Sequence, residues 1–195
     1  MTKLEGYPPR GLDNIMSSTT ATKIENVVLL HSGDLSLDIA NQISTKLTSI
    51  IDSHHVHLIS MAKSKAFKSA LIEDTDGLAK STTLAVFIAS TIENEAPPED
   101  AGACIRFFRR KTHPDTLLKD RVQFTILGLG DSNLLLDRQH TSAKDCNQVA
   151  QALDSRLEAL GAIRFCQRGE ADERTGLTEV EPFIDMLVEK IKSCQ

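Results

Sequence analysis

The stretch VQFTILGLGDSN, residues 122–133, decides the fold of this chain. Its first half is short and largely apolar, which is typical of a strand buried on both faces of a sheet. Its second half is a turn that carries Gly128 and Gly130, followed by Asp131, Ser132 and Asn133. Because glycine lets a ligand approach the backbone closely, we expect the strand to present this turn to a ligand.

Similar strands recur along the chain and alternate with helix-like segments. Further strands are predicted at residues 26–32, 55–61, 83–90 and 163–169, and helices at 37–51, 99–111, 141–162 and 179–193. In the helix at 141–162, Thr141 or Ser142 would be the N-cap, and Gly161 would end the helix. This alternation favours an α/β fold with helices on both faces of a parallel sheet. Five strands fit the doubly wound order 2-1-3-4-5, in which ligands bind beyond the carboxyl ends of the strands.

Length and composition indicate one domain of ordinary size. With 195 residues, of which 41% are hydrophobic, the chain is long enough and apolar enough to form its own core. We expect residues 25–195 to form that domain. The polar segment 1–24, which contains Pro8 and Pro9, is expected to be a poorly ordered arm.

Charge, hydropathy and cysteine usage narrow the class of function. The net charge of -5 argues against a nucleic-acid partner, which would need a basic face. No run approaches the roughly 20 apolar residues that span a bilayer, so no membrane partner is expected. The four cysteines are widely spaced, and we interpret them as reduced thiols of a cytoplasmic protein.

The chain lacks residues that three phosphate-handling or nucleotide-binding classes of protein require. A receiver domain, which shares this architecture, needs an aspartate at the end of the third strand, where this chain has Ser90 and Thr91. A P-loop needs GxxxxGK followed by Ser or Thr, and the chain has no such stretch. The stretch GLGDSN has two glycines of a dinucleotide fingerprint, but it lacks the third and follows the fourth strand.

Several motifs, in order and at matching spacings, resemble a known family. The segments FTILGLGDSN (124–133), KDCNQVAQALDSRLEALGAIRF (144–165) and RGEADERTGLTEVEPFI (168–184) are similar to the FMN-binding flavodoxin-like domain of the diflavin oxidoreductases. Within that family, methionine synthase reductase and its relatives are the most similar. The segment VFIASTIENEAPPEDAGACIRFF (86–108) matches the loop and helix after the third strand. The resemblance covers about residues 26–190.

The resemblance implies that three loops hold FMN. The loop after the first strand would cradle the phosphate at a helix N-terminus, where free amides and the helix dipole favour an anion. The loops after the third and fourth strands would support the ring and the ribityl chain. The cofactor-binding residues implied in this way are His31, Ser32, Gly33, Ser36, Ser90, Thr91, Ile92, Asn94, Leu127, Gly128, Gly130, Asp131, Asn133 and Leu134. After the fifth strand, Glu170, Asp172 and Glu173 would face a redox partner.

The chain departs from the family pattern in each of these three loops. Asp34, Glu93 and Glu95 stand where the family usually has glycine, and Leu134 stands where it has a stacking aromatic. A carboxylate at position 34 would repel a phosphate. Negative charge from Glu93, Glu95 and Asp131 would disfavour additional negative charge on a reduced flavin.

Two functions therefore lead, ahead of a hydrolase or nucleotide enzyme on this fold. The first is an FMN-binding electron-transfer domain of the NADPH-dependent diflavin oxidoreductase type. It would pass electrons from a FAD/NADPH reductase module to an acceptor protein, without a side-chain acid or base. The second is a flavodoxin-like scaffold that has lost FMN and serves as a binding or regulatory module. The GLGDSN turn favours the first function, and the replaced glycines and aromatics favour the second.

Overall fold

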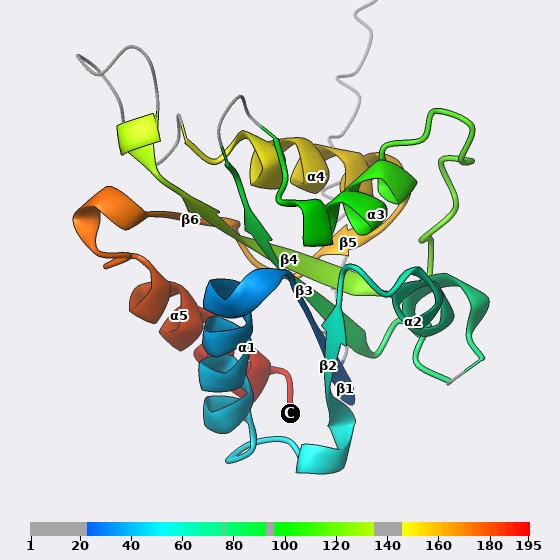
Figure 1. Cartoon of the computed structure of the whole chain (residues 1–195). Helices are drawn as coiled ribbons and strands as arrows, with labels where there is room; N and C mark the ends of the chain where they lie inside the picture. The colour runs from blue at the N-terminus through cyan, green and yellow to red at the C-terminus, as the bar shows by residue number, and fades with distance from the viewer. Residues whose placement is uncertain (1–22, 76, 93–95, 135–145) are drawn as a thin grey trace, which may run out of the picture.

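The chain forms a twisted parallel sheet between two layers of helices (Figure 1). The computed structural model describes residues 23–75, 77–92, 96–134 and 146–195. The strands are β1 Asn26–His31, β2 Val56–Ser60, β3 Thr83–Ser90, β4 Gln123–Gly130, β5 Ile163–Arg164 and β6 Gly169–Asp172. The α-helices are α1 Gly33–Leu47, α2 Ser64–Lys68, α3 Glu99–Phe108, α4 Gln148–Ala159 and α5 Val180–Ser193. Shorter helical turns are η1 Ser53–His55, η2 Ser69–Glu73, η4 Ser132–Leu134 and η5 Glu173–Thr175.

The strand order is β2-β1-β3-β4-β5, as predicted, and every pairing is parallel. The sheet has six strands rather than five, because the predicted strand at 163–169 is divided into β5 and β6, which both pair with β4. Between these two pieces, the Thr125 hydroxyl donates to the Cys166 carbonyl oxygen at 3.4 Å. A side chain thus replaces the backbone ladder at this point of the edge.

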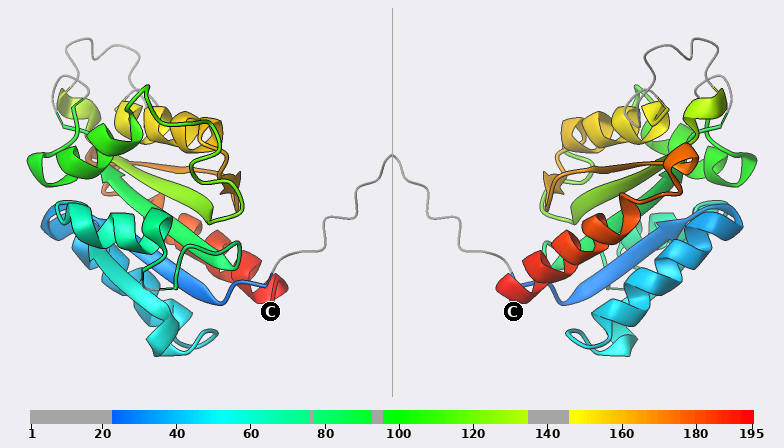
Figure 2. Two further views of the ribbon diagram at one scale, coloured as in Figure 1. Left: turned by 90° about the vertical axis from the view of Figure 1, so that its right-hand side faces the viewer. Right: turned by 90° about the vertical axis from the view of Figure 1, so that its left-hand side faces the viewer.

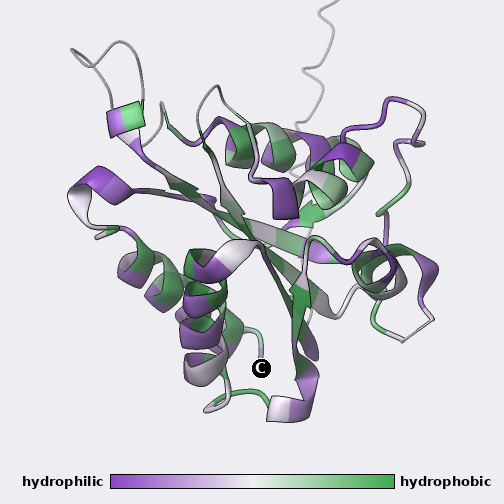
Figure 3. Ribbon diagram, in the orientation of Figure 1, coloured by the Kyte–Doolittle hydropathy of each residue, from purple (hydrophilic) through white to green (hydrophobic). Residues whose placement is uncertain are grey.

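The helices bury the two faces of the sheet in separate cores. On one face, α1 and α5 pack against residues of β1, β3 and β4, including Leu29, Val86 and Leu127. On the other face, α2, α3 and α4 pack against residues such as Phe87 and Phe124. The two side views of Figure 2 show these layers, and Figure 3 shows the apolar strands between them. Burial on both faces explains why the strands are continuously apolar.

Helix α4 starts later than its sequence pattern suggests. The helix begins at Gln148 and its N-cap is Asn147. The prediction of Thr141 or Ser142 as the cap was therefore wrong, although both lie outside the described residues. At the other end, Gly161 adopts φ +89°, a left-handed conformation that ends helices, as predicted.

The two ends of the described chain meet at the amino edge of the sheet. The Gln195 side-chain nitrogen donates to the Ile24 carbonyl oxygen at 2.7 Å, and Figure 2 shows the start of β1 beside the end of α5. Ile24 is 1% exposed and belongs to the core, so the packed region begins by residue 24 rather than 25. Residues 1–22, most of the predicted arm, lie outside the described residues. Within the described part of the chain, no helix is long and apolar enough to cross a membrane. No disulfide joins the four cysteines.

Candidate functional site

A cavity of about 260 Å³ lies at the carboxyl edge of the sheet, where the segments after β1, β3, β4 and β6 converge. In parallel α/β sheets this edge is the usual place for a ligand, because the loops there come from neighbouring strands. The described lining residues are Ser32, Gly33, Asp34, Leu35, Ser90, Thr91, Ile92, Pro98, Leu129, Gly130, Asp131, Leu134, Glu173 and Leu177.

Three large apolar side chains at the cavity are left exposed to solvent. Leu35, Ile92 and Leu134 are 41%, 47% and 44% exposed, and they come from three segments: the first turn of α1 and the segments after β3 and β4. Ile92 is held in place because its amide donates to the Ala96 carbonyl oxygen at 2.8 Å. Apolar side chains gathered around a hollow favour an apolar or flat aromatic ligand.

The segment after β1 provides a polar end to the cavity. Ser32 is 4% exposed, yet its hydroxyl forms no hydrogen bond with any residue that the structure describes. Gly33 has φ +72°, and a Cβ at this position would meet no atom within 4 Å. The adjacent amides of the first turn of α1 have no partner within the helix. An unpaired buried hydroxyl beside a helix N-terminus fits an anionic or polar ligand group.

Ser36 and His31 lie behind this polar end and do not line the cavity. The Ser36 hydroxyl accepts a hydrogen bond from the Ser32 amide and donates to the Ser32 carbonyl oxygen. His31 is the last residue of β1 and pairs with Ser60. Burial, and secondarily the charge of Lys63, lower the pKa of His31. Both residues therefore support the loop from its inner side.

Thr91 joins the loop after β3 to the start of α4. Its amide donates to the Leu129 carbonyl oxygen at 2.8 Å, and its hydroxyl accepts from the Val149 amide at 3.2 Å. The Asn147 side chain makes no capping hydrogen bond within α4, and its nitrogen instead donates to the Ala171 carbonyl oxygen at 2.9 Å. Thr91 thus caps α4 from outside the helix.

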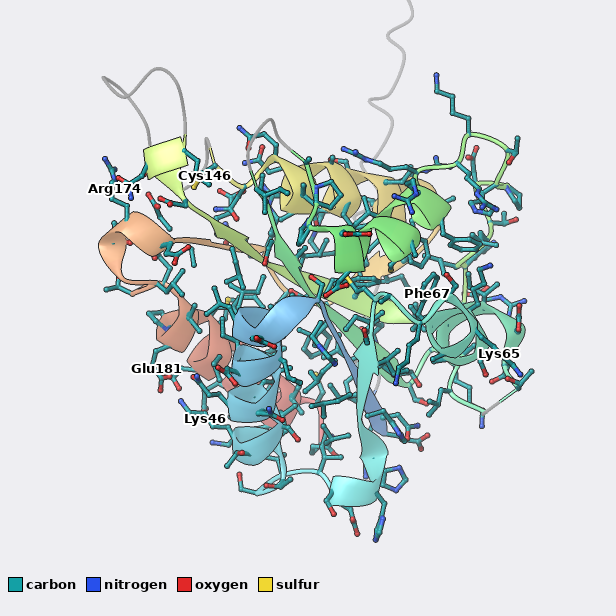
Figure 4. The ribbon with its side chains drawn as sticks, in the orientation of Figure 1. Lys46, Lys65, Phe67, Cys146, Arg174 and Glu181 are labelled. Atoms are coloured by element: carbon teal, nitrogen blue, oxygen red, sulfur yellow. The ribbon has the colours of Figure 1, made fainter. Side chains whose placement is uncertain are left out.

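The glycines of β4 have a packing role on the face of the sheet that α4 covers. A Cβ on Gly128 would lie 2.7 Å from the Ala150 Cβ, and a Cβ on Gly130 would lie 2.6 Å from the Cys146 sulfur. Figure 4 shows Cys146 near the end of β4. The two glycines therefore allow the chain entering α4 to lie directly on the strand. Leu127 points to the opposite face and is fully buried in the core.

Asp172 joins the loops after β4 and β6. Its Oδ1 accepts from the amides of Ser132 and Arg174, both at 3.0 Å. Burial acts to raise the pKa of Asp172, but these hydrogen bonds and the charge of Arg174 outweigh it and lower that pKa. Asp172 is 1% exposed, so the prediction that it faces a redox partner was wrong.

Comparison with known proteins identifies the family. The sequence profile of flavodoxin matches residues 38–183. This chain belongs to the flavodoxin family. Two solved flavodoxins confirm the fold: a mutant from Pseudomonas aeruginosa (TM-score 0.56, 16% identity, covering 85% of this chain and 99% of that one) and oxidised flavodoxin 1 from Bacillus cereus (TM-score 0.57, 13% identity, covering 85% and 96%).

The flavodoxin region of diflavin reductases is more similar in sequence to this chain than the two solved flavodoxins are. Methionine synthase reductase from Bos taurus is 33% identical over 150 residues, which cover 76% of this chain and 19% of that protein. NADPH-dependent diflavin oxidoreductase 1 from Schizosaccharomyces pombe is 39% identical over 89 residues, covering 46% and 14%. The chain therefore spans less than a fifth of these relatives.

The cavity of this flavodoxin-family chain brings together most of the residues that the sequence singled out. Those that line it are Ser32, Gly33, Ser90, Thr91, Ile92, Gly130, Asp131 and Leu134. His31, Ser36, Leu127, Gly128 and Asn133 lie beside or beneath it, and Asn94 is outside the described residues. Leu35, Pro98, Leu129, Glu173 and Leu177 also line the cavity, although the sequence did not indicate them as site residues. Glu173 had been interpreted, with Glu170 and Asp172, as part of a partner surface, and Leu177 had no interpretation of its own.

Proposed function

We propose that this chain binds FMN in the cavity and acts as an electron-transfer domain. The observation that carries the proposal is the placement of Ile92 and Leu134. These exposed apolar side chains come from the loops after β3 and β4 and line one hollow, which also reaches the unpaired Ser32 hydroxyl. An apolar slot with a polar, helix-capped end suits a flat ring that carries a phosphorylated chain.

The apolar lining residues fit the flavin ring of this group in character, and the cavity approximately fits that ring in size. Ile92 and Leu134 would cover the ring and exclude water, and Ser32 with the first amides of α1 would hold the phosphate. The volume of about 260 Å³ is close to the lower end of ligand pockets, roughly 300 Å³. We leave Ser36 out of the proposed contacts because Ser32 already engages its hydroxyl.

Bound FMN would supply the one-electron chemistry. The chain would contribute position and electrostatics. Thr91 and Asp172 hold the loops that carry Ile92 and Leu134, and Asp131 and Glu173 place negative charge at the cavity. The names of the similar proteins support a reductase module as electron donor. We further propose that this module carries FAD and uses NADPH, that a separate protein accepts the electrons, and that the setting is cytoplasmic.

One observation favours a second function, a scaffold that has lost FMN. The described lining contains three carboxylates, Asp34, Asp131 and Glu173, and no lysine, arginine or histidine. Such a lining disfavours a phosphate. A chain of this kind would bind or regulate a partner through the flavodoxin scaffold alone.

Titration with FMN, followed by flavin fluorescence and the visible absorption band, separates these functions. We expect saturable binding to the purified chain, and about tenfold weaker binding in Ile92→Ala and in Leu134→Ala, because each variant removes apolar cover from the ring. Ile163→Ala is the matched control, since Ile163 is 60% exposed on β5 and does not line the cavity. Absence of binding by the wild-type chain would favour the scaffold. An equal loss of FMN affinity in Ile163→Ala would reject the placement of the ring beside Ile92 and Leu134.

A further inference from the structure

The polar end of the cavity carries two opposing electrostatic features. One is attractive: α1 is 15 residues long, and its first amides and the buried, unpaired Ser32 hydroxyl lie at the cavity. The helix dipole adds partial positive charge at this point. The other is repulsive, because Asp34 is in the first turn of the same helix and lines the same cavity.

No described cation in the lining offsets the Asp34 carboxylate. The other charged lining residues, Asp131 and Glu173, are also acidic. Arg174, which follows Glu173, is directed to Asp172, with its Nε 3.8 Å from the Asp172 carboxylate. Lys63 acts on His31, which is behind the loop. A doubly charged phosphate at the start of α1 would therefore meet a carboxylate on its own helical turn.

The ring end of the cavity has no corresponding conflict. Ile92 and Leu134 are apolar and exposed, so they suit any flavin ring whether or not its chain carries a phosphate. The charge of Asp34 consequently acts on one part of the ligand only. Repulsion between one carboxylate and a doubly charged phosphate on the same helical turn is worth about a factor of ten in affinity, even in a water-like dielectric.

We propose that Asp34 is a specificity-determining residue that discriminates against the flavin phosphate, so that this cavity accepts an uncharged flavin such as riboflavin about as well as FMN. The proposal rests on the function proposed above, because it requires that a flavin ring bind in the cavity. The Asp34 side chain would then set the ratio between the affinities for phosphorylated and unphosphorylated flavins.

The test compares the dissociation constants of FMN and riboflavin for the wild-type chain and three variants. Asp34→Asn removes the charge and keeps the shape. Glu173→Gln neutralises another carboxylate of the same cavity, on the segment after β6. Asp38→Asn neutralises an exposed carboxylate of α1 that does not line the cavity. Thermal unfolding of each variant checks that the fold is intact.

For the wild-type chain we expect the two constants to agree within about threefold. Asp34→Asn should tighten FMN binding about tenfold and change riboflavin binding by less than about twofold. Asp38→Asn should leave the ratio of the constants within about twofold of the wild-type ratio, and Glu173→Gln should change that ratio less than Asp34→Asn does.

Three results would overturn the inference while leaving flavin binding intact. These are a wild-type preference for FMN of more than about threefold, an unchanged ratio in Asp34→Asn, and an equal change of the ratio in Glu173→Gln. If neither flavin binds to the wild-type chain or to Asp34→Asn, the proposed function itself fails. The two failures are therefore distinguishable.

Discussion

The Asp172 carboxylate accepts a hydrogen bond from the Ser132 amide at 3.0 Å, and this contact connects the ends of β6 and β4. Ser132 is followed by Leu134, and Asp172 is followed by Glu173, so the contact fixes two loops that line the same cavity. The wall of the candidate site thus depends on a buried charge that is 40 residues away in sequence.

The pH dependence of stability tests this role. Because hydrogen bonds hold the Asp172 pKa below its unfolded value, the ionised form stabilises the fold. That contribution is fully present above the unfolded pKa of about 3.9 and is lost as pH falls through the folded pKa. We expect Asp172→Asn to lower the free energy of unfolding by about 1–2 kcal/mol at pH 7. The difference from wild type, measured by urea unfolding, should shrink below about pH 4. A difference that stays constant down to pH 3 would contradict this role.

Substitution of Gly128 tests the packing role of the β4 glycines. Gly128→Ala should lower the free energy of unfolding by about 1–3 kcal/mol, because the added Cβ meets Ala150 and Asn147 of the segment entering α4. Gly102→Ala is a matched control in α3, where the added Cβ meets only the flexible end of Arg106. The control should be neutral or more stable by up to about 1 kcal/mol. Equal destabilisation of both variants would show that Gly128 is not specially packed.

Most of the sheet was predictable from the sequence because its strands are buried on both faces. The apolar run at 83–90 coincides with β3, and the run at 26–32 ends one residue beyond β1. The break between β5 and β6 was not predictable, since Phe165 and Cys166 continue the apolar pattern while Thr125 interrupts the pairing from the neighbouring strand. Only the three-dimensional pairing reveals it.

The site was partly predictable for a related reason. The loops after β1, β3 and β4 could be placed together because parallel strands bring their carboxyl ends to one edge. The role of Gly128 could not be deduced, because the same sequence suits a close ligand and a close helix. Glu173 and Leu177 were missed as lining residues because their position depends on β6, which the sequence did not separate from β5.

Removal of the Thr91 hydroxyl tests the external cap of α4. Thr91→Val keeps the shape of the side chain but leaves the Val149 amide without its acceptor. We expect a loss of about 1 kcal/mol in the free energy of unfolding. Thr91→Ser retains a hydroxyl and should recover at least half of this loss in the same urea titration. Equal stability of Thr91→Val and the wild-type chain would exclude a capping role.

Asp154 of α4 fixes the divided edge of the sheet. Its carboxylate pairs with Arg164 at 3.0 Å and with Arg168 at 2.6 Å. Asp154→Asn should cost about 2 kcal/mol of unfolding free energy, less than a fully buried pair, because the arginine side chains are 33% and 24% exposed. Glu158→Gln is the control: Glu158 pairs with the same Arg164 but is 59% exposed, and the change should cost less than about 0.5 kcal/mol. Equal costs would mean that burial of Asp154 adds nothing.

Chemical-shift mapping of the ¹⁵N-labelled chain during titration with FMN can locate a flavin in the cavity between Ile92 and Leu134. We expect the largest amide shifts at Gly33, at residues 90–92 and at Asp131, and we expect these shifts to saturate together. A second cavity of about 660 Å³, lined by Arg164, Arg168 and Lys190 beside β5, is the internal comparison. Absence of saturable shifts, or largest shifts in that second cavity, would contradict this location of the flavin.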